Sequence, residues 1–370
     1  MAKKALRFLL LQVINPHYHQ QRAIRNMAEL VQLVTTFGGE ILEKSVQHRV
    51  NPHPDTYIGP GKVEWLLETV KEKKIDVVVI NDLAKSGQLF RLEKTLWKVN
   101  TRIAVWDRVD LILNIFDQHA TSTEAKLQIE LAKIQHKGPR IYGLGGKELS
   151  RQGGGIGTRG LGETNIERER RLIKKRTQEI KAELKQRAKV QETRRKQRQQ
   201  KGIHTVALVG YTSAGKTSLF NALTSKDKEE NKALFTTLDT VVGKIKLSKY
   251  APTLLVSDTI GFIDELPPLL IDAFKSTLME SVEARILLHV IDAADPQMLE
   301  KVDIVEKILM DLNVKKPPIL IFNKIDTTSK ILLDKIKGTF PEREKFFVSA
   351  KTKQGLSELK QHLGATLNIL

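Results

Sequence analysis

Cysteine is absent from the 370 residues of the sequence, and no apolar run approaches the roughly 20 residues that span a bilayer. Without cysteine the chain forms no disulfide and offers no thiolate to a metal ion, which is typical of proteins from reducing compartments. Aromatic residues are also few, at 5%, whereas hydrophobic residues reach 41% and charged residues 28%, a composition typical of globular proteins. We therefore expect a cytoplasmic protein of two or three domains. We also expect a fraction of this protein to be associated with membranes.

A basic flank and a short apolar run open the sequence, a pattern that signal peptides share with first strands. The apolar run ends at Gln12, and no small-residue cleavage site follows it. The pattern therefore favours a strand over a signal peptide.

Acidic residues are too few to balance the basic ones. The chain has 61 Lys and Arg against 43 Asp and Glu, which gives a formal charge of +18 and a pI of about 9.8. General solubility would explain a surplus that is spread evenly, whereas a polyanionic partner would explain a clustered one. Between Ile166 and Lys201 about fifteen basic residues face only five acidic ones, so roughly half of the net charge falls within a tenth of the chain. The distribution favours a nucleic acid partner.

Strand and helix patterns divide the chain into an N-terminal α/β domain (1–115), a helix pair (116–202) and a second α/β domain (203–370). In the first domain we expect strands and helices to alternate, with strands at 6–14, 41–50, 75–80 and 101–106 and helices at 21–36, 63–72 and 88–99. This alternation predicts a parallel sheet. The second α/β domain repeats it, with strands expected at 204–210, 253–258, 285–292, 317–323 and 345–349.

Two long helical patterns, at 110–136 and 163–200, flank a glycine-rich stretch at 138–162. Ile166, Ile173 and Ile180 recur every seven residues and give the second helix a narrow apolar stripe, which suits one partner helix. A stretch so rich in glycine buries no core and is expected to stay mobile. The simplest arrangement is an antiparallel helix pair with the glycine-rich loop at its tip.

The most specific motif is Gly-Tyr-Thr-Ser-Ala-Gly-Lys-Thr at 210–217, which matches the phosphate-loop pattern G-x-x-x-x-G-K-[ST] at every fixed position. An apolar run at 205–209 precedes it and a helical pattern at 218–223 follows it, so backbone N–H groups of the turn would point at an anion. Lys216 is expected to bind phosphate and to act catalytically, and Thr217 to ligate Mg²⁺. The predicted nucleotide site in this segment comprises Gly210, Tyr211, Thr212, Ser213, Ala214, Gly215, Lys216, Thr217 and Ser218.

Three further segments at predicted strand ends decide between ATP and GTP. Asp258-Thr-Ile-Gly261 offers a carboxylate for the Mg²⁺ shell and a glycine N–H for the γ-phosphate. The carboxylate of Asp326, in Asn323-Lys-Ile-Asp326, pairs with N1–H and the 2-amino group of guanine, whereas adenine would leave it unpaired. Ser349-Ala-Lys351 offers a backbone N–H for guanine O6. The site therefore also includes Asp258, Gly261, Asn323, Lys324, Asp326, Ser349, Ala350 and Lys351, and the expected ligand is GTP or GDP.

The segment 225–245 is expected to be an order–disorder switch. Thr237, in Phe235-Thr-Thr237, is placed to ligate Mg²⁺ when γ-phosphate is present. Thr236 competes for the same role, and spacing leaves both open. Phe235, Thr236 and Thr237 complete the predicted site, and Thr237 and Gly261 join Lys216 in its catalytic part.

Phe262 follows Gly261, at the place where Ras-like enzymes carry the Gln that orients the attacking water. A phenyl ring neither donates nor accepts a hydrogen bond. We therefore expect slow intrinsic hydrolysis that a partner accelerates.

Several segments of the first half resemble the HflX family of ribosome-associated GTPases, within the translation-factor-like class. They are Tyr57-Ile-Gly-Pro-Gly-Lys-Val-Glu64, residues 105–117 and 124–131, the glycine-rich run 149–163, and Glu167-Arg-Glu-Arg-Arg171. With the Ras-like G domain, the resemblance covers nearly all of the chain. It implies a monomeric GTP hydrolase that uses Mg²⁺, binds the large ribosomal subunit and its rRNA, and splits or rescues ribosomes under stress.

The sequence also leaves alternatives. Ser213 stands where many relatives have an Asn linked to potassium binding, so the resemblance does not carry potassium stimulation to this chain. Gly59-Pro-Gly-Lys62 resembles part of a phosphate loop, but a turn that opens a helix at Val63 explains it more simply than a second nucleotide site. A GTP-gated RNA-binding or regulatory module, whose hydrolysis is incidental, is the alternative to a ribosome-acting GTPase.

Overall fold

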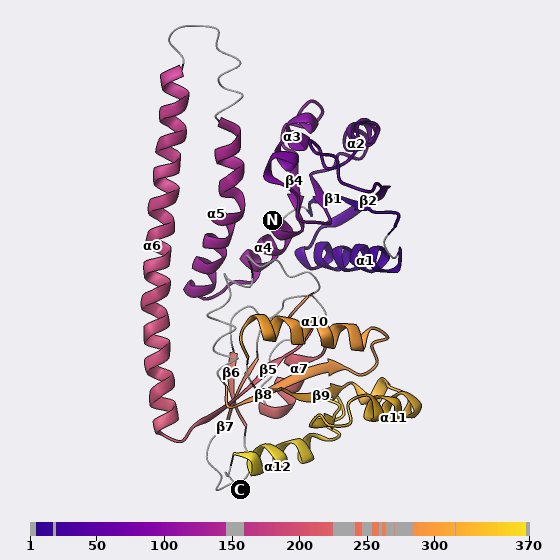
Figure 1. The fold of residues 1–370 in the computed structure, drawn as a ribbon, viewed down its shortest axis with the longest axis vertical. Coiled ribbons are helices and arrows are strands. Elements are labelled where there is room, and N and C mark those ends of the chain that lie inside the picture. The colour runs from indigo at the N-terminus through magenta and orange to yellow at the C-terminus, as the bar shows by residue number, and fades with distance from the viewer. Residues whose placement is uncertain are drawn as a thin grey trace. The chain divides into compact units, whose positions relative to one another are not determined.

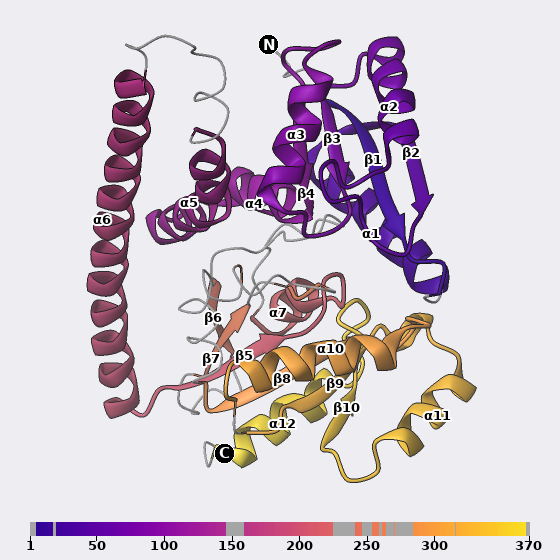
Figure 2. The same ribbon diagram turned by 45° about the horizontal axis from the view of Figure 1, so that its top comes forward.

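The computed structural model describes residues 5–17, 20–145, 159–224, 241–245, 254–258, 261–263, 270, 284–314 and 316–367. These residues form two compact units (Figures 1 and 2). The first unit comprises Met1–Gln118 and Lys126–Glu183, and the second comprises His119–Ala125 and Leu184–Leu370. Each unit has its own sheet, and no helix of the described segments is long and apolar enough to cross a bilayer.

The first unit contains a four-stranded sheet in the order β2-β1-β3-β4, with all its strands parallel. Its strands are β1 (Arg7–Ile14), β2 (Glu40–His48), β3 (Val77–Ile80) and β4 (Ala104–Asp107). The helices that connect them are α1 (Gln20–Phe37), α2 (Pro60–Lys73) and α3 (Ser86–Leu96). The predicted parallel sheet is confirmed, and the apolar run near the start of the chain is an inner strand of it.

Successive side chains of β1 point to opposite faces of this sheet, so one strand supplies two cores. Leu9 and Leu11 pack among buried side chains of α2 and α3. Phe8, on the other face, lies in a triangle of T-shaped contacts with Phe37 and Trp106, whose ring centroids are 5.6 to 5.8 Å apart. Helices therefore cover both faces of the sheet, which explains why its inner strands β1 and β3 are mostly apolar.

The helical pattern predicted for 110–136 is two helices in the structure, α4 (Arg108–His119) and α5 (Thr123–Gly145). The Ser122 hydroxyl accepts a hydrogen bond of 3.1 Å from the backbone N–H of Ala125, so a local cap starts the second helix. The apolar spacing continues across this break, and periodicity alone therefore gives no sign of it.

Helix α6 (Arg159–Gln200) is antiparallel to α5, as predicted (Figure 1). Arg176 donates two hydrogen bonds, of 2.6 and 2.7 Å, to the carboxylate of Glu130. Further along α6, Gln191 donates to Glu124, nearer the start of α5. Ile180, from the predicted apolar stripe, is fully buried.

Both helices extend further than expected into the glycine-rich stretch 138–162. Helix α5 continues to Gly145 and α6 begins at Arg159, while residues 146–158 lie outside the described segments. A glycine costs an established helix only about 1 kcal/mol, so long helices tolerate a few of them. Helical structure therefore extends into both ends of the stretch that was predicted to be a loop.

A buried polar cluster joins α5 to the end of β4 within the first unit. Asp107 accepts hydrogen bonds from the backbone N–H of Asp110 and from the ring of His136, at 2.8 and 3.0 Å. Burial raises the pKa of Asp107, and the bond from His136 opposes that effect. Arg108 beside it pairs with Glu29 of α1 at 2.7 Å. A hydrogen bond therefore joins α5 to the end of β4, and an ion pair joins α4 to α1.

The second unit contains a six-stranded sheet in the order β10-β9-β8-β5-β7-β6, in which only the edge strand β6 is antiparallel. Its strands are β5 (His204–Val209), β6 (Val241–Ile245), β7 (Leu254–Asp258), β8 (Ile286–Asp292), β9 (Ile319–Asn323) and β10 (Lys345–Phe347). The described helices are α7 (Lys216–Thr224), α10 (Met298–Asp311), α11 (Lys330–Thr339), α12 (Leu356–Thr366) and the 3-10 turn η1 (Ile325–Thr327). Side chains of α7 and α12 pack on one face and those of α10 and α11 on the other.

Strand β6 corrects the prediction that all of 225–245 is a switch. Residues 241–245 pair with β7 along their whole length, and Ile245 is buried in the core. The glycine in Val241-Val-Gly-Lys-Ile245 obscured the strand pattern. It lies against Phe220 and Thr224 of α7, so a larger residue there would collide with that helix.

Candidate nucleotide-binding site

The phosphate loop connects β5 to α7, as the motif predicts, and its glycines have conformations that other residues rarely adopt. Gly210 has φ +152 and Gly215 has φ +91. A Cβ atom at Gly210 would collide with the carbonyl oxygen of Val290, and one at Gly215 with the Asn323 amide. The fixed glycines of the motif are therefore required both by backbone conformation and by the close approach of β8 and β9.

Lys216 begins α7 with its ammonium folded back over the loop. Its Nζ donates to the carbonyl oxygens of Gly210 and Tyr211, at 3.0 and 2.8 Å. Burial lowers the pKa of Lys216 to about 8, and the nearby charge of Asp258 opposes the shift. The loop thus holds a cation at its centre, and bound phosphate would favour the charged form of Lys216.

This lysine predicts a pH dependence for the stability of the nucleotide-free protein. The pKa of Lys216 falls from 10.5 to about 8 on folding. Between these two pH values the unfolded chain holds a proton that the folded chain has lost, so the free energy of unfolding rises with pH, by up to about 3 kcal/mol. Below pH 8 both states are protonated and the contribution is constant. Denaturant unfolding of the protein and of Lys216→Met from pH 7 to 10.5 measures the difference, and identical profiles would contradict the prediction.

Thr217 and Asp258 meet across the loop. The Thr217 hydroxyl donates to a carboxylate oxygen of Asp258 at 3.0 Å, and Asp258 is fully buried at the end of β7. A hydroxyl and a carboxylate are oxygen ligands of the kind that Mg²⁺ prefers. The chemistry of these two residues therefore fits a Mg²⁺ ion beside the phosphates, and their role as its ligands stays a prediction.

The segment after β7 is paired with the phosphate loop through its backbone. The Phe262 N–H donates to the Gly210 carbonyl at 3.1 Å, and the Phe262 carbonyl accepts from the Thr212 N–H at 2.7 Å. The Phe262 side chain is buried in the core, with 1% of its surface exposed. A Cβ atom at Gly261 would lie 3.0 Å from the Lys216 Nζ, so Gly261 is next to the predicted phosphate site.

Asn323 braces three segments of the site. Its amide nitrogen donates to the Ala214 carbonyl at 3.1 Å, and its amide oxygen accepts from the Ala350 N–H at 3.0 Å. Lys324, which has φ +64, donates to the Ser213 carbonyl at 2.8 Å and to Asp292 at 2.6 Å. The segment predicted to read guanine therefore also fixes the shape of the phosphate loop.

Asp326 and Ser349 bring the two predicted base-reading segments together. The Ser349 hydroxyl donates to a carboxylate oxygen of Asp326 at 2.7 Å and accepts from the Thr352 N–H at 3.0 Å. A hydrogen bond from serine fixes the orientation of the carboxylate, which a base-recognising group requires.

The remaining predicted residues divide into two groups. Ser218 lies in the first turn of α7, and Lys351 is exposed directly after Ala350. Phe235, Thr236 and Thr237 lie outside the described residues, so the choice between the two threonines stays a prediction.

Three contributors were missed at the sequence level. Asp292 lies at the end of β8 and accepts a hydrogen bond from Lys324. Its position directly after the strand-like run 286–291 is a sequence signal that would have predicted it as a site residue. Lys301 of α10 lies over the Tyr211 ring at 4.9 Å from its centroid and pairs with Asp295 at 2.5 Å. His289 is buried in β8, where burial, then Arg343 and Lys216, lower its pKa to about 3 and keep its ring neutral. Lys301 and Tyr211 are far apart in the sequence, so no local pattern predicts their contact. The same holds for the charged groups that surround His289.

Comparison with known families places each part of the chain. Residues 25–117 match the family described as "GTP-binding GTPase N-terminal", residues 119–198 match "GTP-binding GTPase Middle Region", and residues 205–324 match "50S ribosome-binding GTPase".

Similar proteins carry one common name. The chain is 42% identical to "GTPase HflX" of Caldanaerobacter subterraneus subsp. tengcongensis over 332 residues, which cover 90% of this chain and 74% of the relative. It is 36% identical to "GTPase HflX" of Escherichia coli over 359 residues, which cover 96% and 82%. Among solved structures, a GTP-binding protein from Sulfolobus solfataricus in complex with GDP has the same fold, with a TM-score of 0.51 and 22% identity over 97% of this chain and 98% of that one. The assembled phosphate loop agrees with these matches, and the chain belongs to the HflX family of GTPases, as a GTP-binding protein and GTP hydrolase.

Proposed function

We propose that this GTPase acts on the ribosome: it binds the large subunit and couples its GTP cycle to the splitting or rescue of ribosomes, under stress. The observation that carries the proposal is the basic helix α6, which is joined in one chain to the phosphate loop of a GTPase. The match of residues 205–324 to the family described as "50S ribosome-binding GTPase" supports the choice of partner. We further propose a cytoplasmic monomer with the domain division 1–115, 116–202 and 203–370.

Helix α6 suits the phosphates of rRNA. Its basic side chains are mostly exposed, among them Lys174, Lys175, Lys181, Lys185, Lys189, Arg194 and Lys196. Each Lys or Arg that meets a phosphate releases counterions, so such a helix would bind RNA with a strong dependence on salt. The shape and phosphates of a folded RNA, rather than a base sequence, are what a surface of this kind recognises.

In the proposed site, the amides of 211–217 and Lys216 bind the phosphates, Asn323 and Asp326 read guanine with the Ala350 N–H, and Thr237 senses the γ-phosphate. Thr217 and Asp258 would hold Mg²⁺, which neutralises charge on the β- and γ-phosphates when it is bound. Lys216 would exchange its bonds to the loop carbonyls for phosphate oxygens and stabilise the charge that develops on them as water attacks the γ-phosphate. Gly261, beside Lys216, would present its N–H to the same phosphate.

The residue directly after Gly261 has no polar side chain. Phe262 is buried and its backbone is paired with the phosphate loop, so its ring has no access to an attacking water. The proposal therefore assigns water positioning to a group or a conformation that the ribosome supplies. Positioning of the attacking water by the ribosome would link GTP hydrolysis to binding of the large subunit.

Hydrolysis by the isolated protein should be slow, on the order of 10⁻⁴ to 10⁻² s⁻¹ as in other GTPases without their activators, and purified large subunits should raise the rate at least about 100-fold. Single-turnover phosphate release, with and without large subunits, measures both rates. Lys216→Ala with large subunits controls for contaminating hydrolases. If the protein alone hydrolysed many GTP molecules per second, the idea that the ribosome positions the attacking water would be refuted. RNA binding without any stimulation would favour the regulatory module instead.

A further inference from the structure

The second unit has a pocket at the edge of the sheet opposite the nucleotide site. Strands β8, β5 and β7 begin there, whereas the phosphate loop and the guanine-reading segments follow strand ends at the opposite edge. The pocket has a volume of about 640 Å³. This lies within the range of about 300 to 1,000 Å³ that is typical of small-ligand sites.

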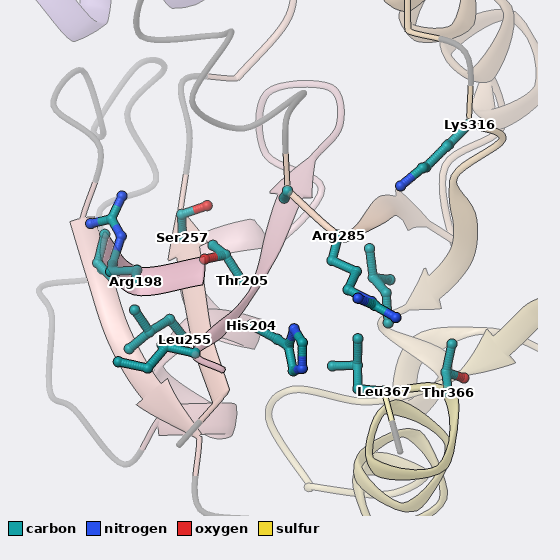
Figure 3. A pocket seen from close by; sticks show the side chains of 13 residues that line it. Arg198, His204, Thr205, Leu255, Ser257, Arg285, Lys316, Thr366 and Leu367 are labelled. Carbon is teal, nitrogen blue, oxygen red and sulfur yellow. The ribbon is translucent and has the colours of Figure 1, made fainter. Parts of the chain in front are cut away.

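Apolar and basic side chains both line the pocket (Figure 3). Ile203, Leu255, Ile286 and Leu367 form much of the apolar part. Arg198, His204, Arg285 and Lys316 form the basic part, and no carboxylate belongs to the described lining. Such a surface suits a ligand that has an anionic group at one end and an apolar or aromatic body at the other.

Arg285, His204 and Lys316 lie on the same side of the pocket (Figure 3). Figure 3 shows the Arg285 side chain extended beside the His204 ring and the Lys316 side chain directed toward Arg285. Within the described segments, neither Arg285 nor Lys316 has a carboxylate at ion-pair distance. Elsewhere in the unit, the less exposed Lys324 pairs with Asp292 and Arg343 with Glu306. An uncompensated group of cations raises the local potential and favours an anion.

The electrostatics of His204 agree with this geometry. Burial and the neighbouring Arg285 guanidinium both lower the pKa of His204. A bound anion would reverse the second effect, because it would favour the charged ring.

We propose that this pocket binds a phosphate ester with an aromatic body, that is, one nucleotide unit, with its phosphate among Arg285, Lys316 and His204 and its base against Ile286 and Leu367. The fork of an arginine with a lysine and a histidine provides several donors for a phosphate, more than one carboxylate would use. The nucleotide is either free or part of an RNA strand, and both offer the same chemistry. This site is separate from the GTP site and does not depend on the ribosomal function.

The test uses the full chain loaded with one equivalent of GDP in the presence of Mg²⁺, with unbound GDP removed, so that the GTP site is filled and no free GDP competes for the pocket. AMP and a fluorescent single-stranded oligoadenylate are titrated separately, by calorimetry and by anisotropy. Arg285→Ala and Lys316→Ala should each weaken binding of at least one probe about fivefold or more, while Lys335→Ala, an exposed lysine of α11, should not. Thr366→Trp, which places a ring at the pocket wall, should weaken it as well. GDP affinity should be the same in all four variants.

The outcomes distinguish a free nucleotide from a nucleotide within an RNA strand, and they also show whether the proposal fails. Weakened AMP binding identifies a free nucleotide, and weakened oligoadenylate binding alone identifies a nucleotide within a strand. An equal loss in Lys335→Ala would show general attraction of charge and would overturn the site. So would the absence of saturable binding, or binding that ignores Arg285, Lys316 and Thr366. A failure here with intact GDP affinity leaves the GTP site unaffected.

Discussion

Replacement of Asp326 with asparagine is expected to change the nucleotide preference of the protein from guanine to xanthine. The Asp326 carboxylate, oriented by the Ser349 hydroxyl at 2.7 Å, is the group proposed to accept from N1–H and the 2-amino group of guanine. An asparagine offers one acceptor and places an N–H against one of those donors. A site built on hydrogen bonds rejects a mismatched ligand by about 10⁴-fold, so GTP affinity should fall by roughly 10³-fold or more. Xanthine, which carries an oxygen at position 2, should bind better than guanine.

Competition of GTP and XTP against a fluorescent guanine nucleotide, and of both against a fluorescent xanthine nucleotide, measures the change. Asp334→Asn, at an exposed carboxylate of α11 that pairs with Lys337 one turn away, is the matched control and should leave both affinities unchanged. If Asp326→Asn kept the preference for GTP, the base would not be read by this carboxylate.

Replacement of Lys216 with alanine is expected to abolish tight nucleotide binding. The ammonium lies buried among the loop carbonyls, where hydrogen bonds to a charged phosphate are poorly screened. Each such bond contributes about 1.5 to 3 kcal/mol, so the loss of two predicts a reduction in affinity of roughly 10²-fold or more. The substitution also removes a buried charge, so the variant should fold.

Calorimetric titration of GDP and of a GTP analogue into Lys216→Ala tests this, with Lys335→Ala as the control at an exposed lysine. Both ligands should lose affinity, the GTP analogue more than GDP, because it carries the additional γ-phosphate. Unchanged affinity would remove Lys216 from the site.

The parts of the site that could be predicted are those in which one short segment determines its own structure. The phosphate loop needs only a strand, two glycines in unusual conformations and a helix start, all of which are adjacent in sequence. Asp258, Asn323 and Ser349 were predicted because each follows an apolar strand, and parallel strands bring their carboxyl ends to one edge. The β-α alternation that fixed this edge was likewise readable from local patterns.

The parts that could not be predicted depend on contacts between distant segments. The backbone pairing of Phe262 with Gly210 and Thr212 requires β5 and β7 to be neighbours, which no single segment shows. The same holds for Lys301 over Tyr211 and for Lys324 with Asp292. The break between α4 and α5 escaped prediction for the opposite reason, since the apolar spacing runs on while the backbone turns.

Asn323 illustrates a role that was predicted incompletely. Sequence reasoning assigned it to guanine, and the structure shows its amide joined to Ala214 and to the Ala350 N–H. The N–H expected to reach guanine O6 is therefore oriented by Asn323. Both assignments to the base stay predictions, but the bracing of the phosphate loop by Asn323 is a second reason for an amide at this position.

The central claim, that a GTP cycle controls attachment to the ribosome, is tested most directly by co-sedimentation of the protein with purified large ribosomal subunits. The protein should pellet with large subunits in the presence of a non-hydrolysable GTP analogue and remain mostly in the supernatant with GDP. Binding should weaken steeply as salt rises from 50 to 200 mM, by about 10³-fold or more if the exposed cations of α6 make at least six phosphate contacts. Equal binding with the two nucleotides, or no binding to the large subunit with the GTP analogue, would contradict the account.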